Sequence, residues 1–351
     1  MCYVVNYLED YSYLCSLKRS TSRIVDIIEN DIYKDYPAAF ALLLKDQTTQ
    51  KNIFWATHDY EDKGKGYQYS DEITIEQITG KNGNVIKPRV LKGKPEQTSR
   101  TKMKAEIFTP SWVCNIQNNV TDESWFGRKG VFNTEDADNM TWEVNTAPIE
   151  FSEDKTWKDY VSARRIEITC GEAPYLASRY DTTSGELIAI GNRIGLLDRK
   201  LRVVGENTST PKEWLESAEI AYKNIYGFEW QGDSLLLARE SLLVTFIEYF
   251  SAKFHTKPEA SSIEKIAYVI SWNLWQMDGL KYVVPDSCHD TKVSNGDMFN
   301  PIEIVTACEG CQTNNIRKHN GVYCLIKNWD EMDKDTGEMG STVRFVDLLK
   351  R

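Results

Sequence analysis

The sequence predicts an α/β protein with a doubly wound, Rossmann-like core, a small N-terminal α+β module and a C-terminal cysteine-rich lobe. From about residue 105, short apolar segments alternate with longer helical patterns, which is typical of a mostly parallel sheet. Residues 165–176 resemble a buried strand that runs into a turn of small residues. A doubly wound sheet opens a nucleotide-sized pocket at such a turn, at the carboxyl end of its first strand. The expected parts are a module at 1–80, a basic connector at 81–104, the core at 105–282 and the lobe at 283–351.

The composition is that of an ordinary soluble globular protein. The chain has 351 residues, of which 41% are hydrophobic and 27% are charged. No apolar run approaches the roughly 18 residues that span a bilayer, and the N-terminus has no signal-peptide pattern, so we expect a cytoplasmic protein. The net charge of −10 argues against a uniformly basic nucleic-acid-binding protein. Eight cysteines without a secretory signal favour reduced thiols or a metal site over disulfides.

The first hundred residues divide into a mixed module and a basic segment. Apolar and aromatic residues are dense at 36–55, and residues 71–78 alternate as a strand does. Residues 81–104 then hold eight Lys or Arg against one acidic residue, Glu96. Such a strip can contact phosphates whatever the charge of the whole chain, although a solvated basic loop has the same composition.

Three helices of the core have clear signals. Thr210-Pro211-Lys212-Glu213 combines a capping box with proline at the first helical position, which predicts a helix to about Asn224. Residues 232–254 carry apolar side chains three or four apart, and a second capping box at Ser261 predicts a helix towards Ile270.

The turn after the first predicted strand points to a ligand without phosphates. Glu167 lies within the strand, and Cys170, Gly171 and Glu172 form the turn. No Lys-Ser/Thr pair follows the glycine, as a P-loop would require. S-adenosylmethionine (SAM) is therefore the candidate ligand.

Two further apolar segments, the second and third predicted strands of the core, each end in a carboxylate. Glu229 ends the second, where it could accept hydrogen bonds from both hydroxyls of a ribose, with Trp230 beside the adenine. Asp278 ends the third, where it could accept a hydrogen bond from the adenine amino group. The alternatives are an exposed carboxylate at a strand end for Glu229 and an ordinary Asp-Gly turn for Asp278.

A fourth motif, Phe108-Thr109-Pro110, lies upstream of the first strand. Pro110 restricts Thr109 to an extended conformation, so the three residues would form a stiff hook that enters a helix.

Together these motifs resemble the adenine-N6 DNA methyltransferases of restriction–modification systems, especially the large fused restriction–methylation enzymes. The resemblance covers about residues 100–280 and includes the segment 194–201. It departs from the family at Ala173, where a second glycine is usual. The resemblance implies SAM as cofactor, DNA as substrate, and cofactor contacts from the matching positions, which are Phe108, Thr109, Pro110, Glu167, Cys170, Gly171, Glu172, Glu229 and Asp278.

The catalytic motif of that family is missing. The family uses an Asn-Pro-Pro-Tyr/Phe box to hold the flipped adenine, and the nearest match here is Asn300-Pro301, without the aromatic residue. We therefore expect the cofactor-binding half of a methyltransferase, with a second subunit that supplies the catalytic box and target recognition in a restriction–modification or anti-phage system. The alternatives are a catalytically inactive DNA-binding or regulatory module with a degenerate methyltransferase fold, and an RNA methyltransferase.

The C-terminal lobe has the cysteine spacing of a metal site. Cys308 and Cys311 have the spacing of a zinc knuckle, and Cys324 follows. We expect Cys288 as the fourth ligand of a structural zinc ion, with His289 and His319 as alternatives. Free cysteines in a loop-rich lobe remain the other interpretation.

Overall fold

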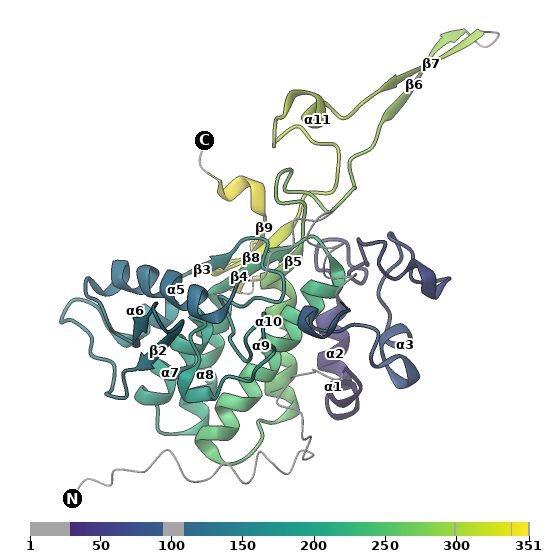
Figure 1. Cartoon of the computed structure of the whole chain (residues 1–351). Helices are drawn as coiled ribbons and strands as arrows, with labels where there is room; N and C mark the ends of the chain where they lie inside the picture. Colours follow the sequence, from purple (N-terminus) through teal and green to yellow (C-terminus); the bar gives the residue numbers. More distant parts are fainter. Residues whose placement is uncertain (1–28, 94–108, 298–299, 338, 350–351) are drawn as a thin grey trace, which may run out of the picture.

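A computed structural model describes residues 29–93, 109–297, 300–337 and 339–349. Figure 1 shows a body of helices around a small central sheet, from which one long hairpin projects. Phe108 and most of the basic strip beyond residue 93 lie outside the described residues. Within them, no helix is both long enough and apolar enough to cross a membrane. The helices are α1 (Glu29–Asp35), α2 (Pro37–Leu44), α3 (Ile75–Ile78), α5 (Ser111–Phe126), α6 (Trp157–Ser162), α7 (Leu196–Asn207), α8 (Pro211–Lys223), α9 (Gly232–Phe254), α10 (Ala260–Asn273) and α11 (Glu309–Thr313).

The central sheet contains the three strands expected from the sequence, but the prediction that the first is buried is wrong, because Ile166 is 46% exposed. Strands β3 (Arg165–Glu167), β4 (Ile225–Glu229) and β5 (Leu274–Gln276) are parallel and lie in that order. This order is the one found in half of a doubly wound sheet. The described residues add no further strand to this sheet, so the complete doubly wound fold stays a prediction.

The other strands form three antiparallel hairpins. The projecting arm in Figure 1 is the β6–β7 hairpin, and the β8–β9 hairpin lies against one face of the central sheet. Their bounds are β1 (Asn133–Asp136) with β2 (Thr141–Val144), β6 (Thr291–Asp297) with β7 (Asn300–Thr306), and β8 (Leu325–Met332) with β9 (Met339–Arg344).

Local sequence signals account for the start of α8 but not for that of α10. At the start of α8, the Thr210 hydroxyl accepts the Glu213 amide at 3.3 Å and the Glu213 carboxylate accepts the Thr210 amide at 3.1 Å, which confirms that capping box. The helix predicted from Ser261 towards Ile270 is α10. The capping box predicted at Ser261 is wrong, because α10 starts at Ala260 with Glu259 as its N-cap.

The strand expected at 71–78 is also wrong over its second half. Residues Ile75–Ile78 form the short helix α3, because Thr74 and Gln77 make a reciprocal capping box. Only Glu72 keeps a β-bridge, to Phe54. The alternating apolar residues of this segment fit one helical turn as well as a strand, and the cap selects the helix.

One hydrophobic core extends across the expected boundary between the N-terminal module and the core. Phe40 and Trp55 belong to the same buried cluster as Leu235 of α9. The Gln276 side chain of β5 exchanges two hydrogen bonds with the Phe54 backbone, at 3.1 and 2.9 Å. A side chain at Gly232 would strike the Phe54 carbonyl oxygen, so glycine is required where the two segments meet.

Several charged side chains of the sequence are buried rather than exposed. In α7, Asp198, Arg199 and Lys200 are consecutive and each is at most 2% exposed. The Arg199 guanidinium donates to Asp122 of α5 at 2.6 Å, so the segment 194–201 fixes α5 against α7. Burial of such groups is tolerated only where partners satisfy them.

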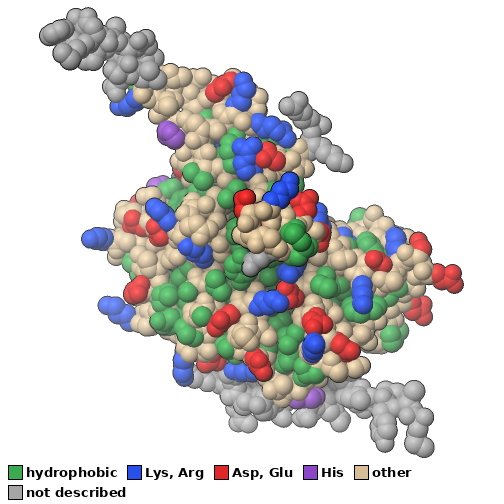
Figure 2. All heavy atoms as spheres, turned by 180° about the vertical axis from the view of Figure 1, so that it is seen from behind, with side chains coloured by type: hydrophobic (Ala, Val, Ile, Leu, Met, Phe, Trp, Pro, Cys, Tyr) green, Lys and Arg blue, Asp and Glu red, His purple; other side chains and the backbone are tan. Residues whose placement is uncertain are grey.

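The basic connector also contributes to the interior. The Lys92 ammonium pairs with the Asp233 carboxylate at 2.9 Å, with both side chains almost completely buried. Lys92 therefore cannot make the phosphate contact that the charge pattern suggested. On the face seen in Figure 2, Lys and Arg are interspersed with Asp and Glu.

Candidate cofactor site and candidate metal centre

The turn after β3 contacts the acid that ends β4. The Gly171 amide donates to the Glu229 carboxylate at 2.9 Å, and the Cys170 amide donates to the Phe228 carbonyl oxygen at 2.9 Å. Glu167 and Glu229 are the last residues of adjacent parallel strands, so both carboxylates lie at the same edge of the sheet. The structure thus brings Glu167, Cys170, Gly171 and Glu229 together.

The turn itself has an unusual backbone. Gly171 has a φ of 53°, and the non-glycine residues Thr169 and Ala173 have φ values of 47° and 59°. Such left-handed conformations cost a residue with a side chain about 1–2 kcal/mol. The family's usual glycine at position 173 thus suits the conformation that Ala173 adopts here.

Glu167 has acceptor capacity that the described residues do not use. Its side chain is buried, one oxygen accepts the Tyr175 amide at 3.4 Å, and Oε2 accepts no hydrogen bond. Burial raises the pKa of Glu167 well above its usual value, against the lowering effect of the Tyr175 and Leu176 amides. An unpaired buried carboxyl oxygen at a strand end is suited to receive a donor from a ligand.

Thr109 and Pro110, the described residues of the hook, lie beside this turn. Pro110 is extended at ψ 147° and α5 begins at the next residue, as expected. The Thr109 carbonyl oxygen accepts the Thr182 hydroxyl at 3.1 Å, and the Cys114 thiol lies 3.6 Å from the same oxygen. Burial, and then the charge of Glu167, raise the pKa of Cys114 to about 12. The fourth motif and the first are therefore neighbours.

Two other predicted contacts, Glu172 and Trp230, have partners within the chain. Glu172 accepts the Arg89 amide at 2.7 Å and the Tyr180 hydroxyl. The Trp230 indole nitrogen donates to the Tyr69 hydroxyl at 3.1 Å.

Asp278 behaves as the residue of an Asp-Gly turn. Its Oδ1 accepts the amides of Leu280 and Lys281, at 2.9 and 3.2 Å, and its Oδ2 pairs with the Lys281 ammonium at 3.2 Å. These contacts match the turn that was the alternative to a cofactor role.

Among the residues that the structure describes, a cavity lies elsewhere on the sheet. Its volume is about 200 Å³, and Ile166, Tyr226, Trp275 and Phe345 contribute to its apolar wall. It adjoins β8, on the face of the sheet opposite α9. No site residue predicted from the sequence lines it.

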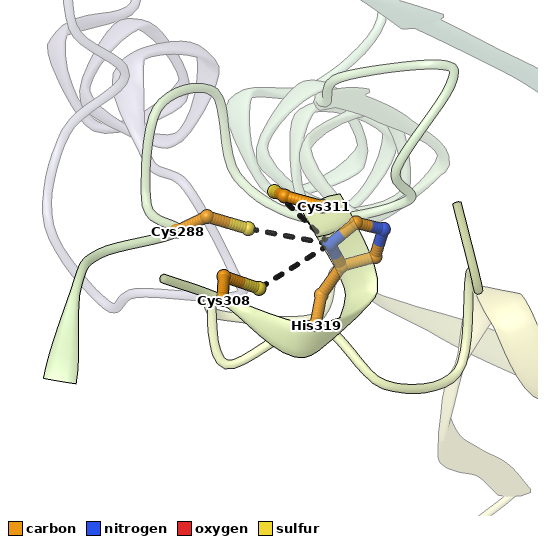
Figure 3. Close-up of side chains that lie close together, drawn as sticks. All are labelled: Cys288, Cys308, Cys311 and His319. Atoms are coloured by element: carbon orange, nitrogen blue, oxygen red, sulfur yellow. Dashed lines mark hydrogen bonds between the residues drawn. The ribbon is translucent and has the colours of Figure 1, made fainter. Parts of the chain in front are cut away.

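Four side chains of the C-terminal lobe converge on one point. Figure 3 shows Cys288, Cys308 and Cys311 directed at His319. The three sulfur atoms lie 3.5, 3.7 and 3.6 Å from the His319 Nδ1, and all four ligand atoms lie within 4.8 Å of one another. A tetrahedral zinc ion with bonds of about 2.3 Å to sulfur and about 2.0 Å to nitrogen separates these atoms by about 3.6 Å. The cluster therefore fits a bound metal ion.

The local backbone explains why these residues meet. Cys308 and Cys311 flank the first turn of α11, and the Asn320 amide donates to the Cys308 sulfur at 3.3 Å. A Cβ atom at Gly310 would lie 2.5 Å from the His319 backbone nitrogen, so only glycine lets His319 approach α11 this closely.

The thiols of the cluster change one another's acidity. Burial and the neighbouring Cys311 and Cys308 thiols raise the pKa of Cys288 to about 12. Burial raises the pKa of Cys308 too, but hydrogen bonds from the Asn320 and Cys311 amides outweigh it and lower the value to about 6. Three thiolates so close together repel one another, and a divalent cation removes that repulsion.

The fourth residue of the cluster is His319, which corrects the first expectation of Cys324. The Cys324 side chain is completely buried and its thiol donates to the Gln276 carbonyl oxygen at 3.4 Å. His289 is exposed and lies outside the cluster. Cys324 belongs to an apolar run from Val322 to Ile326 that enters β8, whereas His319 lies in a polar turn; this difference was the available sequence signal.

The weak catalytic candidates Asn300 and Pro301 are part of β7. They pair with Asp297 and Gly296 on the arm that projects from the body in Figure 1. The arm extends away from the sheet that carries Glu167 and Glu229.

No protein-family model, curated protein or solved structure matches this chain. The resemblance to adenine-N6 methyltransferases therefore depends on the four motifs alone.

Proposed function

We propose that this chain binds SAM at the carboxyl ends of β3 and β4 and is the cofactor-binding half of an adenine-N6 DNA methyltransferase. The observation that carries the proposal is the pair of buried carboxylates at adjacent strand ends, Glu167 and Glu229, joined by a glycine turn. Glu229 would accept the ribose hydroxyls, Glu167 would receive a donor through its unused oxygen, and Trp230 would lie beside the adenine.

The residues present are suited to binding rather than to acid–base chemistry. When bound, SAM would supply a methyl group to the adenine amino nitrogen, S-adenosylhomocysteine would leave, and the nitrogen would lose one proton to water. The protein contributes by holding the two reactants in line. The flipped adenine needs a pocket of its own, which in the family comes from the missing Asn-Pro-Pro box. A second subunit would supply that pocket.

Titration calorimetry with SAM tests the proposal directly. We expect the intact chain to bind SAM and Glu229→Ala to bind at least about tenfold more weakly, because hydrogen bonds to a charged group contribute about 1.5–3 kcal/mol. The control is Glu216→Ala on α8, whose carboxylate is 65% exposed, and it should bind as the unaltered chain does. Absence of binding to the unaltered chain would reject the proposal.

The isolated chain is expected to transfer little or no methyl to DNA. The reason is the missing target-base box, since correct placement of the base supplies most of the rate enhancement. The measurement is incorporation of labelled methyl groups from SAM into adenine. Robust incorporation by the chain alone would show that another part of it holds the base.

One observation favours the non-catalytic alternative. The carboxylates of Asp278, Glu172 and Glu229 already accept hydrogen bonds from the chain's own backbone. A regulatory or DNA-binding module with a degenerate methyltransferase fold would show this arrangement, and it would show no SAM binding in the titration above.

We also propose that the metal in the cluster is zinc and that its role is structural. Three thiolates and one imidazole complete a tetrahedron and leave no open position for a substrate. Cys288 precedes β6 by three residues and Cys308 follows β7 by two, so the ion would close the base of the projecting arm.

A further inference from the structure

The Tyr69 hydroxyl connects two parts of the molecule. It accepts a hydrogen bond from the Trp230 indole nitrogen at 3.1 Å and donates one to the Asp286 carboxylate at 2.5 Å. Burial and the Asp286 carboxylate raise the pKa of Tyr69 to about 12, so the hydroxyl keeps its proton at physiological pH. We refer to Trp230, Tyr69 and Asp286 as the Tyr69 bridge.

One end of the Tyr69 bridge is attached to the metal cluster. Asp286 precedes the ligand Cys288 by two residues and has a left-handed φ of 54°, a conformation that few non-glycine residues adopt. Two hydrogen bonds fix the intervening Ser287. Its amide donates to the Val284 carbonyl oxygen at 3.1 Å, and its hydroxyl accepts the Val322 amide at 3.0 Å. A constraint on Cys288 therefore acts on Asp286.

The other end of the Tyr69 bridge is attached to the candidate cofactor site. Trp230 follows Glu229 directly, and its carbonyl oxygen accepts the Gln276 side chain of β5 at 2.8 Å. The loop of Tyr69 is held to the same region, because the Ala56 amide donates to the Tyr69 carbonyl oxygen at 2.8 Å.

A second contact runs from the cluster to the third strand end. The Lys281 ammonium pairs with Asp278, and the Cys311 and Cys288 thiols also act on it electrostatically. Two sets of contacts thus connect the metal cluster to the strand ends: the Tyr69 bridge and the Lys281–Asp278 pair.

We propose that occupancy of the metal cluster sets the affinity of the strand-end site through the Tyr69 bridge, with Tyr69 as a positioning residue. The inference rests on the proposed function for the identity of the ligand. A bound ion fixes Cys288, which holds Asp286 against Tyr69 and keeps the Trp230 indole in one orientation. Loss of the ion frees this chain of contacts, and the ligand must then order Trp230 when it binds, which weakens binding.

The test compares metal-loaded and chelator-stripped protein in three forms: unaltered, Tyr69→Phe and Tyr67→Phe. Tyr67→Phe is the matched control, because its hydroxyl donates to the Gln77 carbonyl oxygen in the same segment and takes no part in the Tyr69 bridge. Stripping should weaken SAM binding about fivefold or more in the unaltered chain and in Tyr67→Phe. In Tyr69→Phe, binding should be weak already and change less than about twofold. Equal affinity of the loaded and stripped unaltered chain would overturn the proposal, and so would a fivefold loss in Tyr69→Phe.

A second readout does not depend on SAM. Hydrogen–deuterium exchange reports the Ala56 amide, bonded to the Tyr69 carbonyl oxygen, and the Gly232 amide, bonded to the Trp55 carbonyl oxygen at 3.1 Å. Stripping should speed exchange at both amides in the unaltered chain and in Tyr67→Phe, and leave it unchanged in Tyr69→Phe. If no form binds SAM, the proposed function fails, while exchange still decides the Tyr69 bridge: unchanged exchange in the stripped unaltered chain rejects it.

Discussion

Replacing Cys308 with alanine is expected to lower the zinc content from about one ion per chain to less than about a tenth, because a structural site loses most of its binding free energy with one ligand. Cys308 is one of the four residues of the cluster, and its sulfur is 3.7 Å from the His319 Nδ1 and accepts the Asn320 amide. Metal analysis after gel filtration with excess zinc measures the change. Limited proteolysis should then cut residues 288–319, which the ion no longer holds together.

Two further variants decide which residue is the fourth ligand. His319→Ala should lose the metal as Cys308→Ala does, whereas Cys324→Ala should keep it, because the Cys324 side chain faces the core. Retention of zinc by His319→Ala together with its loss from Cys324→Ala would reverse this assignment. Less than about half an equivalent in the unaltered chain after gentle purification would count against a zinc site altogether.

Arg239→Met is expected to lower the free energy of unfolding by about 4 kcal/mol, the scale on which removal of one partner from a buried charged network destabilises a protein. The Arg239 side chain is completely buried in α9. Its guanidinium donates to the carbonyl oxygens of Leu43 at 2.6 Å, Lys45 at 2.9 Å and Leu274 at 2.6 Å, and also to that of Ser271. These groups end α2 and α10 and begin β5, so one side chain satisfies the backbone where three elements meet. Methionine would fill the volume but leave the carbonyl oxygens without donors.

Urea denaturation monitored by circular dichroism measures this loss. Arg128→Met is the control, because Arg128 is exposed and its guanidinium donates to one carbonyl oxygen, that of Glu150. We expect its effect to stay below about 1 kcal/mol. A similarly small effect for Arg239→Met would show that water or neighbouring groups replace the lost donors.

Local signals predicted the elements whose reasons lie in neighbouring residues. The capping box at Thr210 begins α8, Pro110 directs the chain into α5, and the apolar spacing of residues 232–254 matches α9. Strands β3, β4 and β5 lie where short apolar segments end in or just before an acidic residue. The zinc-knuckle spacing of Cys308 and Cys311 likewise identified two members of the cluster.

Long-range partners decided what local patterns could not. Lys92 belongs to a basic strip in the sequence, and its partner Asp233 lies 141 residues away. In the sequence, the charged run Asp198-Arg199-Lys200 is an ordinary one. In the structure, Arg199 contacts α5, and Lys200 donates to the carbonyl oxygens of Ala163 and Asn224. A charge pattern predicts exposure because most charges are solvated, and only the folded chain shows which ones are paired.

By itself, the sequence predicted the three strands of the central sheet, the helices α8, α9 and α10, the four motifs and the metal-knuckle spacing of Cys308 and Cys311. These follow from side-chain spacing, capping and turn chemistry, which act over a few residues. The tertiary structure alone decided that His319 rather than Cys324 completes the cluster, that Asp278 caps its own turn, and that Tyr69 joins Trp230 to Asp286. The contacts of Cys324 and Tyr69 depend on the direction of a side chain relative to residues distant in sequence, and packing of the whole core sets that direction. The Asp278 contacts are local, and the structure selected the turn from two interpretations that the sequence left open.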